Sequence, residues 1–123
     1  MTKPVAEDRR LIRISRICAR LPRTERDYNG RHAAFRVAKK TYAWFLHDHH
    51  GDGIVSLCVK VLPGDNARLA AASPERFYPP AYLASRGWVA LRLDRGAIDW
   101  DEVTELLKGS YKLIAPKSLG GGV

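Results

Sequence analysis

The residues best suited to metal or acid–base chemistry lie together between His47 and Asp52, a segment with three histidines and two aspartates. Imidazole and carboxylate groups are common ligands of divalent metals in proteins. Two of these histidines and Asp52 would supply three ligands, but the spacing places no fourth. Asp and Gly are also the residues that tight turns require. The sequence therefore favours a hydrogen-bonded turn and predicts no metal, while the role of the turn over residues 49–53 stays open.

A second set with possible chemistry is Ser110, Tyr111 and Lys112 near the C-terminus. A serine–lysine pair could act as nucleophile and base, but all three residues fall on one predicted helix that has no oxyanion site. Ser110 is expected to hydrogen-bond back onto its own helix, as serine often does. The chain also contains no GxGxxG, Walker, HExxH or GxSxG motif. We therefore predict that it is not an enzyme and needs no cofactor.

Four arginines recur at helical spacing near the N-terminus, and they form a stripe separate from the apolar one. The four are Arg9, Arg13, Arg16 and Arg20. Residues 1–36 hold ten basic and four acidic residues, so they carry +6 of the formal net charge of +8. Arginine suits bidentate phosphate contacts. The stripe predicts a face that follows a nucleic-acid backbone, although a purely solvated helix face would have a similar composition.

A second basic set is predicted on the sheet. Arg36, Lys60 and Arg92 alternate onto its polar face, and Lys39 and Lys40 occupy a hairpin corner. Trp88 falls on the same face by alternation. Basic groups beside an exposed Trp88 or Trp44 would hold phosphates and stack on bases. The alternatives are that residues 77–78 cover Trp88 and that the lysines only protect a strand edge.

The periodicity of apolar residues predicts the elements that must position these groups. A first helix should run from about Pro4 to Arg20, and the last should begin at Asp99 with a capping box. A polar loop is expected over residues 23–32 and an edge segment over 77–80. The remaining elements are strands at 35–38, 41–47, 53–61 and 88–93 and a short helix at 66–72.

This order, α-β-β-β-α-β-α, predicts an α+β fold: a two-layer sandwich in which helices pack on one face of an antiparallel sheet. Alternation in the third strand predicts one buried face, with Ser56, Cys58 and Lys60 on a face that is at least partly wet. The 123 residues suit a single domain over 1–119 with a flexible tail at 120–123.

Cysteine content and hydropathy bear on the compartment. Cys18 and Cys58 are far apart and form no CxxC motif, so both are expected to be reduced packing residues. The sequence contains no apolar run of membrane-spanning length and no signal-peptide pattern. A cytoplasmic protein without a membrane partner is therefore predicted.

Several segments in their order along the chain resemble the MmcQ/YjbR family of small bacterial proteins. The similarity runs from about Leu21 to Leu119, and its most characteristic segments are 35–61, 77–83, 87–94 and 110–116. The resemblance implies a frataxin/CyaY-like fold and a DNA-binding role, for which a double-wing arrangement of hairpins has been proposed. It implies no reaction and no cofactor. Frataxin-type iron binding does not carry over, because the Arg stripe replaces the acidic ridge of the first helix.

Two functions follow as hypotheses. The first is a non-enzymatic domain that binds nucleic acid, DNA in particular, through phosphate contacts and without base specificity. The alternative is an interaction module with no nucleic-acid role, which would bind a protein or a small anionic ligand on its sheet face or along residues 77–82. A concave apolar pocket would favour the alternative. The sequence does not define the oligomeric state or the pathway.

Overall fold

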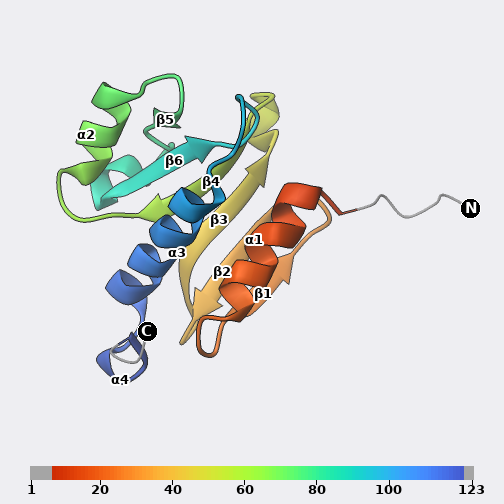
Figure 1. Cartoon of the computed structure of the whole chain (residues 1–123). Helices are drawn as coiled ribbons and strands as arrows, with labels where there is room; N and C mark the ends of the chain where they lie inside the picture. Colours follow the sequence, from red (N-terminus) through yellow and green to blue (C-terminus); the bar gives the residue numbers. More distant parts are fainter. Residues whose placement is uncertain (1–6, 121–123) are drawn as a thin grey trace, which may run out of the picture.

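A six-stranded, fully antiparallel sheet organises the computed structural model, which describes residues 7–120 (Figure 1). Its strand order is β1-β2-β3-β4-β6-β5. The strands are β1 (Glu25–Tyr28), β2 (Ala33–Val37), β3 (Lys40–His47), β4 (Val55–Lys60), β5 (Phe77–Tyr78) and β6 (Trp88–Arg92). The predicted α+β class and the predicted order of elements are confirmed, with β1 as an added edge strand and β5 within the predicted edge segment.

Two long helices, α1 (Arg9–Ala19) and α3 (Trp100–Ile114), lie side by side on one face of the sheet (Figure 1). The shorter α2 (Asp65–Ala72) lies against β6 and β5, and α4 (Lys117–Gly120) follows α3. Two 3₁₀ turns, His49–Gly51 and Ala84–Arg86, complete the order. Among residues 7–120, no helix is both long and apolar enough to cross a membrane.

Capping by Asp8 sets the start of α1. Its Oδ1 accepts a hydrogen bond from the backbone N–H of Arg10 at 2.8 Å, which satisfies one of the free amides of the first turn. The helix therefore begins at Arg9, later than the predicted start near Pro4, a residue outside the described range. Leu11, Ile14 and Cys18 form its buried face, as the sequence predicted.

Asp99 caps α3 as predicted, because its side chain accepts from the backbone N–H groups of Asp101 and Glu102. Ser110 on this helix is fully buried. The expectation that its hydroxyl bonds back to its own helix is wrong. The Ser110 Oγ donates to the Tyr42 carbonyl at 2.6 Å and accepts from the Lys60 N–H at 2.9 Å. One side chain thus joins α3 to two adjacent strands of the sheet.

Strand β1 was not predicted and lies inside the expected polar loop. Its sequence, Glu-Arg-Asp-Tyr, has little strand propensity and no alternation of apolar residues. It forms because β2 offers a free edge, to which all four residues pair. Asn29 and Gly30 lie in the turn from β1 to β2, where the Asn29 Oδ1 accepts from the N–H groups of Arg31 and His32.

The hairpin between β2 and β3 turns one residue earlier than predicted. Ala38 and Lys39 have φ values of +50° and +66°, the pattern of a two-residue type I′ turn, and Lys40 already belongs to β3. Both lysines are exposed. At the other edge of the sheet, β5 pairs antiparallel with β6, which confirms the predicted edge segment.

The core has two parts, one on each face of the sheet. The larger lies between the sheet and the helices, where Phe35, Phe45, Leu57 and Tyr111 are each at most 1% exposed. The smaller contains Cys58, Trp88 and Ala90 on the opposite face. The expectation of a partly wet face is therefore wrong for Ser56 and Cys58, both fully buried, because the segment around Tyr78 covers them.

Candidate nucleic-acid interface and sheet-face pocket

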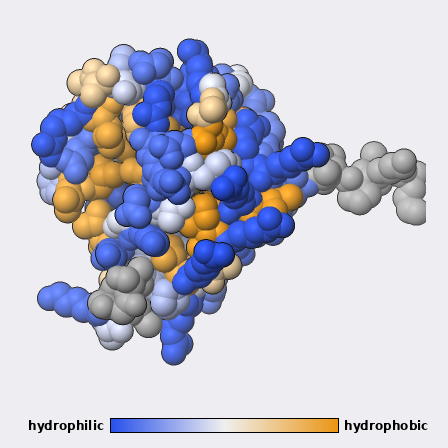
Figure 2. Space-filling view, in the orientation of Figure 1, coloured by the Kyte–Doolittle hydropathy of each residue, from blue (hydrophilic) through white to orange (hydrophobic). Residues whose placement is uncertain are grey.

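The four arginines of the predicted stripe all lie on the outer side of α1, because α1 buries its other side against the sheet. Arg9, Arg13, Arg16 and Arg20 are exposed. At 1.5 Å per residue, they extend over about 17 Å along the helix axis. Figure 2 shows hydrophilic side chains gathered over this helix. The sequence thus placed this row on one surface correctly.

These guanidinium groups are available to an external anion. Among the ion pairs of residues 7–120, none involves the four arginines. Arg13 packs its guanidinium 4.6 Å above the ring centre of Trp100, a contact that orients the group without neutralising its charge. A row of unpaired guanidinium groups is a suitable surface for phosphate.

The C-terminal ends of α1 and α3 and the β2–β3 hairpin meet at one end of the molecule (Figure 1). Two hydrogen bonds join them. The Tyr111 hydroxyl donates to the Pro22 carbonyl at 2.7 Å, and the hydroxyls of Thr24 and Tyr42 are 2.8 Å apart. We call this end the basic end, defined by six exposed side chains: Arg20, Arg23, Lys39, Lys40, Lys112 and Lys117.

Acidic side chains concentrate at the opposite end of the strands. Asp8 and Asp99 cap the two long helices there, and Asp48 and Asp52 form the turn between β3 and β4. Glu25, in contrast, is an exposed acid close to the basic end. The net charge of the molecule is therefore polarised along the strand direction.

The predicted basic residues of the sheet do not form one surface. Arg36 is paired with Asp27 at 3.0 Å, and Arg92 makes two 3.0 Å hydrogen bonds to Asp94, which raise its pKa. Lys60 is half-buried and pairs with Trp88, at the opposite end of the β4–β6 ladder from Arg92. These three side chains are therefore poor candidates for a common phosphate contact.

Trp88 is 6% exposed, so its indole has no free face for a base. It packs with Trp44, Leu46 and Tyr78 in the smaller core. Stacking by Trp88 required an exposed ring, a condition that the structure does not meet. Trp44 is half-buried and faces a pocket instead.

That pocket, with a volume of about 570 Å³, lies on the helix-free face of the sheet at the end opposite the basic end. Its walls come from strand β3 (Trp44, Leu46), from Tyr78 and from the following segment 79–83. The lining is mostly apolar, and its polar groups include His32, His49 and Asp52. The alternative function named residues 77–82 as a binding segment and a concave apolar pocket as a feature that would favour it. The sequence did not bring His32 of the β1–β2 turn together with His49 and Asp52 of the β3–β4 turn, because β1 was not predicted.

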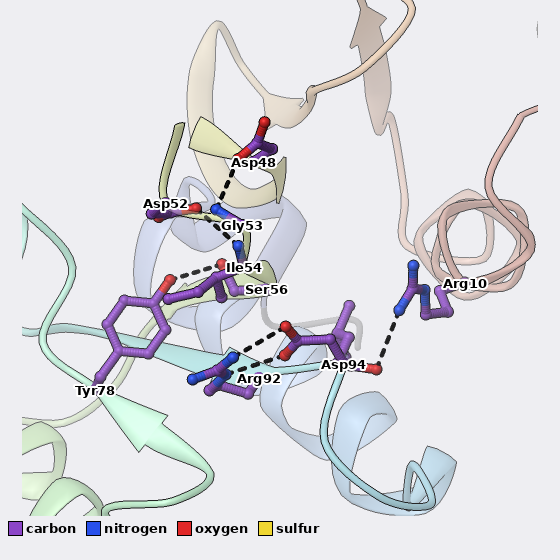
Figure 3. A network of polar contacts seen from close by, with 10 residues as sticks. Arg10, Asp48, Asp52, Gly53, Ile54, Ser56, Tyr78, Arg92 and Asp94 are labelled. Carbon is purple, nitrogen blue, oxygen red and sulfur yellow. Dashed lines mark hydrogen bonds and ion pairs between the residues drawn. The ribbon is translucent and has the colours of Figure 1, made fainter. Parts of the chain in front are cut away.

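The turn over residues 48–53 is held by its own carboxylates. The Asp48 Oδ1 accepts from the Gly53 N–H at 2.6 Å, and the Asp52 Oδ1 accepts from the Ile54 N–H at 2.9 Å (Figure 3). Asp48 adopts the left-handed conformation, with φ +55°, that aspartate tolerates in turns. Among the side chains that the structure describes, which do not include that of His50, no three of His, Cys, Asp or Glu are arranged to hold a metal ion.

Burial shifts the pKa of several groups. Desolvation, reinforced by the nearby Arg31 charge, lowers the pKa of His32. Burial raises the pKa of Cys18 and of Cys58 to about 12 each, so both thiols are protonated and inert at neutral pH. Both cysteines are free and buried.

Sequence reasoning did not identify three members of the basic end as candidates: Arg23, Lys112 and Lys117. The position of Lys112 near the end of α3 already had a local explanation, because cations are favourable near helix C-termini. Only the packing of α3 beside α1 brings it near the arginines. No local signal in the sequence could have grouped residues so far apart.

These features define a class of protein: a small α+β domain with an open six-stranded antiparallel sheet and a polarised charge distribution. A family model described as YjbR matches residues 19–113, most of the chain. The protein therefore belongs to the YjbR family, as the resemblance predicted.

Two solved structures share the fold. The first is protein DR2400 of Deinococcus radiodurans, described as a DUF419 domain, with 26% sequence identity and a TM-score of 0.70. It covers 96% of this chain, which spans 85% of that one. The second is a Pseudomonas syringae protein with 19% identity and a TM-score of 0.64, over 87% of this chain and 98% of that one. No curated protein matches the chain.

Proposed function

We propose that this protein binds nucleic acid, with DNA as the first candidate, as a non-catalytic cytoplasmic domain. One observation supports the proposal above the others: exposed basic side chains without ion-pair partners in residues 7–120 lie along α1 and continue onto the basic end. Phosphate contacts position a protein on nucleic acid but carry no sequence information, so binding would be non-specific.

The proposed surface combines a helix face with a hairpin tip. The four arginines, Arg9, Arg13, Arg16 and Arg20, would follow one backbone. At the hairpin tip, the exposed Lys39 lies in the tight turn and the exposed Lys40 begins β3. Because the tip is exposed and held by a two-residue turn, it would approach a groove as a wing. In the proposed interface, three other basic residues would add positive charge without direct phosphate contact: Arg36, Lys60 and Arg92.

Fluorescence anisotropy with labelled duplex DNA, single-stranded DNA and RNA tests the proposal. We expect binding that weakens linearly on a log–log plot between about 50 and 200 mM salt, with a slope near −0.9 per phosphate contact on a duplex. Lys39→Glu/Lys40→Glu and Arg13→Glu/Arg16→Glu should each reduce the magnitude of the slope by about 2.

The matched control is Arg31→Glu/Arg95→Glu, which makes the same change in net charge on exposed residues at the opposite end of the sheet. It should lower affinity much less than either interface variant. If all three double variants weaken binding equally, net charge alone is responsible and the proposed interface is wrong. Absence of binding at low salt would refute the function itself.

The second candidate function is an interaction module with no nucleic-acid role. The specific observation in its favour is the concave, mostly apolar pocket between β3 and the segment after Tyr78. Ligand pockets of this kind typically combine apolar walls with a few polar groups. A partner whose affinity does not change with salt, and does change when the pocket is altered, would favour this candidate.

A further inference from the structure

The pocket on the helix-free face has aromatic walls suited to a flat ligand. Trp44, Tyr78 and Tyr82 all line the pocket, and Trp44 and Tyr78 also pack against the smaller core. Prolines 79 and 80 add rigid apolar surface between the two tyrosines. Aromatic and proline faces bury a planar group with little loss of side-chain entropy. The shape therefore favours a small ring system over a flexible chain.

Tyr82 has two properties that the fold itself does not require. Its side chain is 89% exposed, and its backbone has φ +66°, a left-handed conformation that is unfavourable for a bulky residue. Exposed aromatic area and local backbone strain both cost free energy, and strained residues cluster at functional sites. A ligand that covers the ring would bury this exposed aromatic area.

Asp52 supplies the charge of the pocket. One carboxylate oxygen accepts from the Ile54 N–H, and no ion pair within residues 7–120 involves this side chain. Arg92 is near enough to interact with Asp52 electrostatically, but both of its hydrogen bonds go to Asp94 (Figure 3). Among the described residues, the Asp52 carboxylate therefore forms no ion pair with the neighbouring arginine, which is engaged by Asp94.

His32 adds no positive charge to the pocket, and the Arg31 guanidinium, which lies 3.2 Å from the His32 Nε2, is not among the lining side chains. The His32 Nδ1 accepts from the His47 backbone N–H at 3.1 Å, an interaction that requires a ring nitrogen without a proton. Burial and the Arg31 charge also lower the pKa of His32, which keeps its imidazole neutral. The His32 and His49 ring centres are 5.3 Å apart in an edge-to-face arrangement.

From this geometry we propose that the pocket binds a small organic cation with a flat aromatic body. The ring system lies against Trp44, Tyr78 and Tyr82, and its amino, ammonium or amidinium group faces the Asp52 carboxylate. Aromatic faces attract cations, which strengthens the same preference. The proposal concerns a site separate from the nucleic-acid surface and a ligand of opposite charge to it.

Three planar probes of nearly equal shape and different charge test the proposal: benzamidine, benzamide and benzoate. Titration of the ¹⁵N-labelled full chain, followed by amide and indole NMR signals, reports affinity and location together. We expect benzamidine to shift the signals of Trp44, Asp52, Tyr78 and Tyr82. Benzamide should bind about tenfold more weakly, the effect of losing one charge-assisted contact, and benzoate more weakly still.

Two variants assign the contacts. Asp52→Asn keeps an acceptor for the Ile54 N–H while removing the charge, and it should reduce benzamidine affinity about tenfold. Asp101→Asn removes one exposed charge from α3 and serves as the matched control, with no expected effect. Tyr82→Ala truncates a solvent-exposed ring that no fold contact needs, so its expected loss of affinity does not depend on refolding.

The proposal is overturned if benzoate binds as tightly as benzamidine, if Asp52→Asn and Tyr82→Ala both bind benzamidine like the original chain, or if the shifted signals lie outside the pocket. DNA binding measured on the same variants should stay unchanged. Failure of the pocket proposal and failure of the nucleic-acid proposal are therefore separate results.

Discussion

A single buried hydroxyl, that of Ser110, fixes the relation between α3 and the sheet. It satisfies the carbonyl of Tyr42 and the N–H of Lys60, on two adjacent strands. Tyr42 is the unpaired residue at the irregularity in the β2–β3 register, so its carbonyl needs this partner. Among residues 7–120, no buried side-chain nitrogen or oxygen atom lacks a hydrogen-bond partner.

The Ser110→Ala variant should therefore be strongly destabilised. It leaves two buried backbone groups without a partner, and each such group costs about 1–3 kcal/mol. We expect the free energy of unfolding in urea to fall by about 2–4 kcal/mol. Thr104→Ala on the same helix is the control, because its hydroxyl only bonds back to the Trp100 carbonyl. An equal loss in both variants would contradict the bridging role.

At the scale of elements, α1 depends on its cap. Asp8 accepts from the Arg10 backbone N–H and pairs with the Arg10 side chain at 2.7 Å. The hydrogen bond from the Arg10 side chain, the largest influence, holds the pKa of Asp8 below its ordinary value despite partial burial. An acid with a lowered pKa stabilises the fold above its unfolded pKa, and the stabilisation is lost as the pH falls through the folded value.

Asp8→Ala should cost about 1 kcal/mol at neutral pH, the usual effect of losing an N-cap. The difference between the two proteins should shrink as the pH falls below about 4, since Asp8 is then protonated in both the folded and unfolded states. Urea unfolding at several pH values measures this difference in the free energy of unfolding. Asp8→Asn keeps the acceptor and should recover most of the loss near neutral pH. A difference that is independent of pH would argue against the charge contribution.

How far the elements were predictable depends on whether their signal is local. The apolar stripes of α1 and α3 are local, and both predictions are confirmed. The alternation in β4 is also local, and it identified the face toward the helices, but the other face is buried as well, at Ser56 and Cys58. β1 is stabilised by pairing with β2 and has no pattern of its own. The second buried face was missed for the same reason: Trp88 and Cys58 are covered by residues near Tyr78, which follow a two-residue strand.

For the candidate site, the sequence predicted that Arg9, Arg13, Arg16 and Arg20 share one helix face, because helical spacing alone decides it. It could not predict that Lys112 and the Lys39–Lys40 tip lie at the end of that face, since this depends on how α3 packs. It did not pair Arg92 with Asp94 either: residues two apart in a strand share a face, but Asp94 lies beyond the predicted end of the strand at residue 93.

At the scale of the whole molecule, charge and shape separate two surfaces. The basic end gathers the ends of α1 and α3 and the β2–β3 hairpin, while the turn at residues 48–53 and the pocket lie at the other end. Figure 1 shows that the strands run between these two ends. A ligand at either end should therefore leave a distinct footprint.

NMR titration of the labelled chain with a short duplex should shift amide signals in α1, in the 38–40 turn and at the end of α3. Signals of Gly53 and Arg95, at the opposite end, should remain in place. The physical reason is that phosphate contacts act on groups within direct reach at moderate salt. The same titration at high salt is the control, because the shifts should disappear. Shifts centred on the pocket would instead indicate that DNA occupies it.

The eight residues of β3 begin at the basic Lys40 and end at His47, beside the pocket. At about 3.3 Å per residue this is a separation near 23 Å, roughly three Debye lengths at physiological ionic strength. The field of one end is therefore almost fully screened at the other. A polyanion held at the β2–β3 hairpin and a small cation beside Asp52 would therefore influence each other little through their charges, and each should bind with nearly the affinity that it has alone.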